Sequence, residues 1–207
     1  MAQFFQIHPQ NPQMRLVDQA VGIIRGGGLI AYPTDSSYAL GCHLGDKAAM
    51  ERIRRLRQVG DRHHFTLVCR DLSELALYAK VDNSTYRLLK AHTPGPYTFI
   101  LPATREVPRR LQNPRRKTIG LRVPDHPIPQ ALLTRLGEPL MSSTLIMPGQ
   151  TTPLGDPEEI REVLEHQVDL VIDGGFCGLE PTTVIDLVDG APRLARQGCG
   201  EPIPELA

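Results

Sequence analysis

The sequence lacks an excess of charge of either sign. Lysine plus arginine and aspartate plus glutamate number 23 each, so the formal net charge at pH 7 is +0. A neutral chain has no overall electrostatic field that would attract it to nucleic acid or to a membrane surface. Any preference for a charged partner must therefore come from a local cluster of side chains.

Closely spaced cysteines and long apolar runs are also missing. The four cysteines form no C-x-x-C pair and show no metal-ligand spacing with the seven histidines, so we expect reduced thiols and no metal site. No apolar run reaches the roughly 18 residues of a membrane-spanning helix. The N-terminal segment has no cationic region followed by an apolar stretch. The sequence thus predicts a cytoplasmic protein with no membrane contact.

No internal repeat and no compositionally biased tract divides the chain. Its 19 prolines and 18 glycines indicate many short connections, but none of these stretches has the composition of a linker. With 207 residues, 41% of them hydrophobic, the chain can bury a core and lies just above the usual size of one domain. We predict a single domain over residues 1–207.

Helical and strand patterns alternate along the chain. Apolar spacing, capping residues and glycine stops predict helices over residues 12–25, 71–79, 82–92 and 127–136, and helices that begin at Asp46 and Asp156. Short apolar runs predict strands over residues 29–32, 65–69, 97–101, 118–123, 139–144 and 168–172. Residues 183–188 and 193–196 form a predicted hairpin with an Asp189-Gly190 turn.

This alternation decides the predicted fold class. Strands that alternate with helices favour parallel neighbours, whereas the closing hairpin must be antiparallel. We therefore predict an α/β fold, with α+β as the alternative, built on one twisted mixed sheet with flanking helices.

Hydroxyl groups concentrate in the segment from Tyr32 to Gly41, directly after the first predicted strand. In open α/β sheets ligands bind beyond the carboxyl ends of strands, so this loop suits a small polar substrate. A turn that satisfies its own backbone explains the same composition equally well. The glycines at 26–28 instead precede a strand, a position that indicates a helix end and not a phosphate-binding loop.

Residues 32–42, YPTDSSYALGC, resemble the YPT-x-x-x-Y-G-L-G-C segment that opens the YrdC family of threonylcarbamoyl-AMP synthases. Segments 49–53, 94–98, 121–124, 138–144, 181–186 and 196–198 match further family segments in order. The resemblance covers essentially the whole chain and implies a YrdC-like fold. It also implies a reaction in which threonine and bicarbonate form a carbamate. The carbamate attacks the α-phosphate of ATP, with Mg²⁺ bound to ATP, and yields threonylcarbamoyl-AMP and pyrophosphate.

The resemblance also implies roles for individual residues. Catalytic positions fall on Thr34 and Arg57. Substrate positions fall on Thr34, Asp35, Ser36, Tyr38, Arg122, Thr182 and Thr183. Nucleotide positions fall on Arg57, Ser142, Thr144 and Arg196. An alternative role for Arg122 is to brace a strand end through a surface carboxylate.

Two positions depart from the catalytic members of the family and are similar to the YciO branch. The family K-x-R reads Arg57-Gln58-Val59, and the family S-x-N reads Thr144-Leu145-Ile146. Valine and isoleucine cannot donate to phosphate, and loss of one such donor costs about 10²- to 10³-fold in rate. We therefore expect weakened synthase activity. Candidates for compensating groups are Arg54, Arg55, Arg62, His63 and His64.

Two further functions are compatible with the same scaffold. One is a non-catalytic protein that binds nucleotide or RNA. The other is a related carbamoyl transfer to a different amine, because a substrate pocket can change while the scaffold stays.

Residues 105–117 form a basic segment in this neutral chain. Its cations are Arg105, Arg109, Arg110, Arg115, Arg116 and Lys117, and its one acid is Glu106. Together with Arg52, Arg54 and Arg55 they form a predicted basic face suited to the phosphates of double-stranded RNA. The family resemblance also implies binding of double-stranded RNA or tRNA. In the alternative, this is a solvated loop whose arginines pair with the acidic helix at 156–165.

Overall fold

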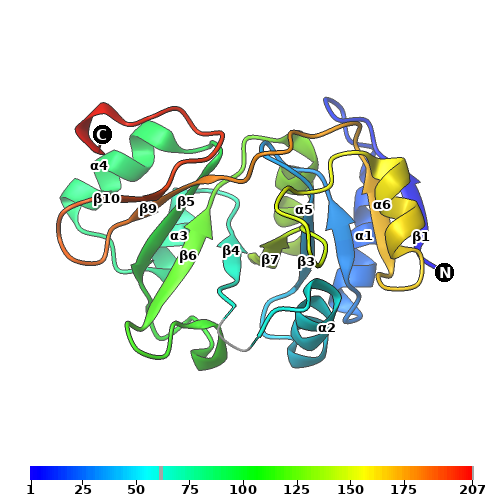
Figure 1. Ribbon diagram of the computed structural model, residues 1–207, viewed down its shortest axis with the longest axis horizontal. Coiled ribbons are helices and arrows are strands. Elements are labelled where there is room, and N and C mark those ends of the chain that lie inside the picture. Colours follow the sequence, from blue (N-terminus) through cyan, green and yellow to red (C-terminus); the bar gives the residue numbers. More distant parts are fainter. Residues whose placement is uncertain (61–62, 207) are drawn as a thin grey trace.

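The protein is described by a computed structural model that covers residues 1–60 and 63–206. One twisted sheet of ten strands runs through the molecule in the order β1-β8-β2-β3-β7-β4-β6-β5-β9-β10, with helices packed on it (Figure 1). Four neighbouring pairs of strands are parallel and five are antiparallel. The predicted fold class, a mixed sheet with flanking helices, is confirmed.

The strands are β1 (Gln3–Gln6), β2 (Ile30–Tyr32), β3 (Ala39–His43), β4 (Thr66–Val68), β5 (Tyr97–Pro102), β6 (Thr118–Arg122), β7 (Leu140–Thr144), β8 (Leu170–Asp173), β9 (Thr183–Asp186) and β10 (Arg193–Arg196). The helices are α1 (Met14–Arg25), α2 (Lys47–Arg57), α3 (Leu72–Tyr78), α4 (Asn83–His92), α5 (Pro127–Leu136) and α6 (Pro157–Leu164), with 3₁₀ turns η1 (Arg109–Leu111) and η2 (Pro204–Leu206).

The predicted helix starts are confirmed by their capping side chains. Asp46, Asp71 and Asp156 each accept a hydrogen bond from a backbone N–H in the first turn of the following helix, at 2.8–3.0 Å. These contacts satisfy N–H groups that have no partner inside the helix. The helix predicted over residues 12–25 begins slightly later, at Met14.

Three local predictions are corrected by the structure. Residues 39–43 form strand β3 between β2 and β7, not the end of a polar loop, and β1 was not predicted at all. Strand β3 is buried on nearly its whole length, so it lacks the polar–apolar alternation that marks a half-exposed strand. The closing hairpin is present, but β9 ends at Asp186 and the connection runs from residue 187 to residue 192. The side chain of Asp186 ends the strand by accepting from the backbone N–H of Val188 at 3.1 Å.

Two hydrophobic cores use alternate residues of the strands, because successive side chains point to opposite faces of a sheet. Ile30 belongs to the core beneath α1 and α5, whereas its neighbour Ala31 belongs to the core beneath α2 and α6. Helices α3 and α4 contribute Leu75 and Leu89 to the core beneath α2 and α6. No helix within residues 1–60 and 63–206 has the length and apolar character needed to cross a membrane.

Candidate functional site

A cavity of about 420 Å³ lies against the adjacent strands β7, β4, β6, β5 and β9. Most residues of its floor lie two apart along these strands or directly before one: Thr66 and Val68, Thr98 and Ile100, Thr118 and Gly120, Ser142 and Thr144, and Thr182 and Val184. Two of the residues between them, Leu67 and Phe99, pack in the core, whereas Ser143 lines the cavity together with its neighbours Ser142 and Thr144. Small hydroxyl side chains therefore cover one face of five strands and leave the space that forms the cavity.

The lining of the cavity is basic. Its described lining residues include no aspartate or glutamate, whereas the basic ones are Arg57, His63, His64, Arg116, Arg122 and Arg196. These side chains come from the end of α2, the segment before β4, both ends of β6 and the end of β10. A concave site lined by one sign of charge concentrates ligands of the opposite sign. The cavity is thus suited to an anion.

The C-terminal end of α2 places Arg57 beside Ser143 and His63. Nη1 of Arg57 donates to Oγ of Ser143 at 2.7 Å, and Nε donates to the carbonyl of Ile146 at 3.3 Å. Nε2 of His63 lies 2.8 Å from Oγ of Ser143. Burial, followed by the charge of Arg57, lowers the pKa of His63 to about 4, so its ring is neutral at pH 7.

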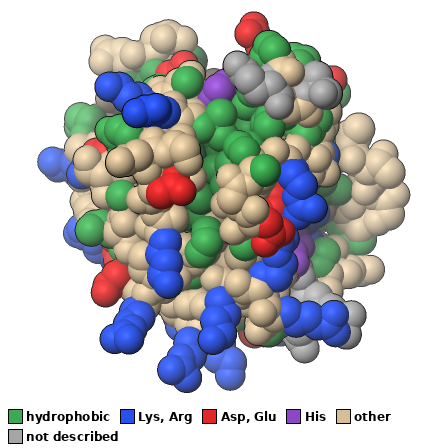
Figure 2. Space-filling model, turned by 90° about the vertical axis from the view of Figure 1, so that its left-hand side faces the viewer, with side chains coloured by type: hydrophobic (Ala, Val, Ile, Leu, Met, Phe, Trp, Pro, Cys, Tyr) green, Lys and Arg blue, Asp and Glu red, His purple; other side chains and the backbone are tan. Residues whose placement is uncertain are grey.

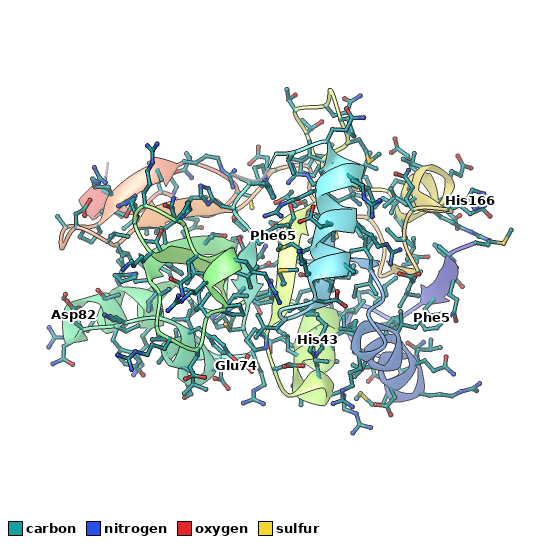
Figure 3. The ribbon with its side chains drawn as sticks, turned by 90° about the horizontal axis from the view of Figure 1, so that it is seen from below. Phe5, His43, Phe65, Glu74, Asp82 and His166 are labelled. Carbon is teal, nitrogen blue, oxygen red and sulfur yellow. The ribbon has the colours of Figure 1, made fainter. Side chains whose placement is uncertain are left out.

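Aromatic contacts hold this corner of the cavity. The ring of Phe65 meets the ring of His63 edge-on, with 5.2 Å between centroids, and the guanidinium of Arg54 lies 5.5 Å from the Phe65 centroid. Figure 3 shows Phe65 near the middle of the molecule, beside helix α2. Rigid packing of this kind fixes the position of His63 relative to Arg57.

Arg122 and Asp35 form a buried ion pair at the edge of the cavity. Arg122 thus pairs with a carboxylate at the end of β6, as the alternative role predicted, but the side chains are only 9% and 8% exposed, so the partner is not at the surface. Arg122 donates through Nη2 to the carboxylate of Asp35 and through Nη1 to Oγ of Ser36 at 3.3 Å. Its Nε is buried without a hydrogen-bond partner. Arg122 also lines the cavity, so its guanidinium places a paired positive charge at the edge of that space.

The loop after β2 satisfies its own backbone. Oγ1 of Thr34 donates to the carbonyl of Ser37 at 2.6 Å and accepts from the N–H groups of Ser36 and Ser37, each at 3.2 Å. Tyr38 is buried, and its hydroxyl donates to the carbonyl of Gly175 at 2.9 Å. The structure therefore places Thr34 and Tyr38 outside the cavity lining. The loop reaches the cavity through Ser37 instead.

Strands β9 and β10 complete the opposite wall. Oγ1 of Thr182 lies 2.8 Å from Oγ1 of Thr98, and Nη2 of Arg196 donates to the carbonyl of Thr182 at 2.8 Å. Thr183 points to the other side of β9, where its hydroxyl donates to the carbonyl of Gly200 at 3.0 Å. Of the predicted site residues, the cavity brings together Arg57, Arg122, Ser142, Thr144, Thr182 and Arg196.

Sequence reasoning missed part of this site. Ser143 was not predicted, His63 was considered only as a compensating group, and Arg116 was assigned to the basic face. The alternation of small hydroxyl residues with core residues on five strands is the signal that identifies the floor. Of the two departing positions, the side chain of Ile146 lines the cavity and that of Val59 does not. Arg62 lies outside the described residues.

The predicted basic face is only partly free of intramolecular partners. Three of its arginines form ion pairs: Arg52 with Asp169 at 2.7 Å, Arg54 with Glu51 at 2.5 Å, and Arg116 with Asp186 at 2.7 Å. No described residue of segment 105–117 pairs with helix α6, so that alternative is wrong. Figure 2, seen from the side of β10 and α4, shows Lys and Arg side chains gathered along the lower edge. The exposed predicted cations without an ion pair in the described structure are Arg55, Arg105, Arg109, Arg110, Arg115 and Lys117.

The family model described as telomere recombination, which groups the Sua5, YciO and YrdC proteins, matches residues 22–198. The chain belongs to the Sua5/YciO/YrdC family. The YciO protein of Escherichia coli K12 is 61% identical to it over 206 residues, with full coverage of both chains. The crystal structure of Escherichia coli YciO superposes with a TM-score of 0.96 over the whole of both chains.

More distant members of the Sua5/YciO/YrdC family carry the name of an activity. A threonylcarbamoyl-AMP synthase of Nitrosococcus oceani is 36% identical over 156 residues, covering 75% of this chain and 83% of that protein. The crystal structure of Pyrococcus abyssi Sua5 complexed with L-threonine has a TM-score of 0.86 and 27% identity, and the match covers 94% of this chain and 57% of that one. The family and its fold are therefore established for this chain.

Proposed function

We propose that this chain forms threonylcarbamoyl-AMP from ATP, L-threonine and bicarbonate, for tRNA modification and with weakened activity. The cationic cavity carries the proposal, because its basic side chains and hydroxyl floor match the charges of a triphosphate and a carbamate. Its volume of about 420 Å³ lies within the usual range of small-molecule sites. The family relationship to threonylcarbamoyl-AMP synthases supports the same reaction.

Each wall of the cavity has a role in the proposed reaction. Arg57 and Arg196 stabilise the charge that develops on the phosphates during displacement of pyrophosphate. The guanidinium of Arg122, which borders the cavity, binds the carboxylate of L-threonine. The threonine and serine hydroxyls of the floor hold the ribose and the carbamate.

Mg²⁺ enters this reaction with its substrate ATP. The described lining residues include no carboxylate that would hold the ion by itself, so the phosphates of ATP are its main ligands. When bound, Mg²⁺ neutralises part of the triphosphate charge. The arginines neutralise the remainder.

Pyrophosphate release from ATP and Mg²⁺ tests the proposal directly. We expect slow release by the purified protein that requires both L-threonine and bicarbonate. The double variant Val59→Arg with Ile146→Asn should be at least about tenfold faster, because Ile146→Asn places in the cavity lining a donor of the kind worth about 10²-fold in rate. No release in either protein, alongside measurable ATP binding, would favour the non-catalytic alternative. Release stimulated by an amine other than L-threonine would favour the related carbamoyl transfer.

We further propose that the exposed cations of segment 105–117 bind double-stranded RNA or tRNA. The observation that favours this function is the group of exposed arginines that make no ion pair in the described structure. Such a face is suited to binding the phosphates of a nucleic-acid backbone. Segment 105–117 contains no aromatic residue, which disfavours stacking on single-stranded bases.

The RNA proposal predicts a steep salt dependence. Replacing Arg109 and Arg115 with alanine should weaken binding of a tRNA or RNA duplex and reduce the slope of log K against log salt by about one unit per lost contact. Arg15→Ala, an exposed site on α1, serves as the control. Salt-independent binding, or equal binding by the double variant, would contradict the proposal.

A further inference from the structure

The tautomer of His63 follows from its neighbours in the cavity. A guanidinium carries only N–H donors, so the 3.3 Å contact between Arg57 Nη1 and His63 Nε2 requires Nε2 to accept. The proton of the neutral ring therefore lies on Nδ1. Oγ of Ser143 accepts from Arg57 at 2.7 Å, which directs its own hydrogen to Nε2 of His63 at 2.8 Å.

This cluster holds one positive charge beside a neutral base. Among the described residues, the charged or titratable groups that act on His63 are Arg57 and Arg54 of α2 and the adjacent His64, and Phe65 packs against the ring. All three groups disfavour a second positive charge on His63 while the cavity holds no anion. An anion placed within about 4–6 Å reverses this balance, because it favours the protonated ring.

We propose that His63 and Arg57 form a proton-coupled polyphosphate site, in which Nε2 of His63 takes up a proton from solvent when the anion binds. In the protonated ring, Nε2 no longer accepts from the hydroxyl of Ser143. Its new N–H donates to Oγ of Ser143 instead. The hydroxyl hydrogen of Ser143 is released from the histidine and turns to the anion. The site thereby gains a second positive charge and a hydroxyl donor without a second arginine.

The inference deepens the proposed function, since it assigns the polyphosphate subsite of the same cavity, and it rests on that function for the identity of the natural ligand. Binding of inorganic pyrophosphate tests it without turnover. Unchanged proton coupling in a protein that makes no threonylcarbamoyl-AMP would contradict only the proposed function. Normal synthase activity without proton coupling would contradict only the role of His63.

The experiment is calorimetric titration of the full chain with pyrophosphate at pH 6, 7 and 8. Between pH 8 and pH 6, the affinity of the wild type for pyrophosphate should increase about tenfold more than that of His63→Gln. This is the increase expected when binding raises the pKa of His63 by several units to near 7. The comparison cancels the protonation of pyrophosphate itself. His64→Gln is the matched control and should keep the wild-type pH dependence. His63→Arg carries a permanent charge, so it should bind pyrophosphate tightly at pH 8 and lack the histidine-dependent gain in affinity at pH 6.

Imidazole nitrogen NMR of the wild type gives a second readout that does not depend on the folding of the glutamine variant. The His63 signals, assigned by their absence in His63→Arg, should change from the Nδ1-protonated neutral form to the imidazolium form when pyrophosphate is added at pH 6. An unchanged His63 spectrum in a protein saturated with pyrophosphate would overturn the inference. Equal pH dependence of affinity in the wild type and His63→Gln would overturn it as well.

Discussion

Replacing Arg57 with methionine is expected to lower pyrophosphate release by about 10²- to 10³-fold. Arg57 lines the cavity at the end of α2 and makes no ion pair in the described structure. Its hydrogen bonds go to Ser143 and to the carbonyl of Ile146, which leaves its charge available to an anion. Methionine keeps most of the aliphatic length and removes the charge and the donors.

The test compares kcat and KM for ATP in three variants. Arg57→Lys keeps a cation but loses the planar fork, so it should retain part of the activity that Arg57→Met loses. Arg15→Met, exposed on α1 and remote from the cavity lining, should behave as the wild type. A fall confined to KM would assign Arg57 to substrate binding alone. Full activity of Arg57→Met would remove Arg57 from the proposed mechanism.

Replacing Asp35 with alanine is expected to lower the free energy of unfolding by about 3 kcal/mol. The variant leaves the buried guanidinium of Arg122 without its charge partner. It also removes the acceptor of the backbone N–H of Asp125, which lies 2.9 Å from the carboxylate. The value is at the lower end of the range for such pairs, because Arg122 borders the cavity.

Urea unfolding of the purified variants measures this loss. The ion pair of Asp18 with Arg135 provides the contrast, because its side chains are 46% and 48% exposed. Asp18→Ala should therefore cost much less than Asp35→Ala. Asp35→Ala combined with Arg122→Met should recover part of the lost stability, since the unpaired charge is gone. Equal losses in Asp18→Ala and Asp35→Ala would show that burial of the pair has no energetic consequence.

Local patterns were sufficient to predict most of the elements. The caps at Asp46, Asp71 and Asp156 act within one helical turn, so their sequence signals need no tertiary information. Strand β3 was missed because it directly follows the hydroxyl-rich loop and contains Gly41, a residue type depleted in strands, so it shows neither a continuous apolar run nor alternation. The end of β9 was misplaced because the side chain of Asp186 ends the strand. Its carboxylate accepts one hydrogen bond from the nearby backbone N–H of Val188 and another from Arg116, which is distant in sequence.

The candidate site was predicted less completely than the fold. The resemblance identified Arg57, Arg122 and Arg196, and the structure brings them to one cavity. It did not distinguish Thr182 from Thr183, which point to opposite sides of one wall. The pairing of Arg57 with Ser143 joins residues 86 positions apart in the chain. No local pattern contains that information.

The sequence by itself determined the family, the mixed α/β class and the positions of the helices, because capping, periodicity and ordered motifs are properties of short segments. Only the tertiary structure decided which side chains share the cavity and which charges are already neutralised. Strand order places β7, β4, β6, β5 and β9 side by side, although they are not consecutive in the chain. Burial then decides that His63 is neutral and that Arg122 is paired, since both depend on neighbours that the fold supplies.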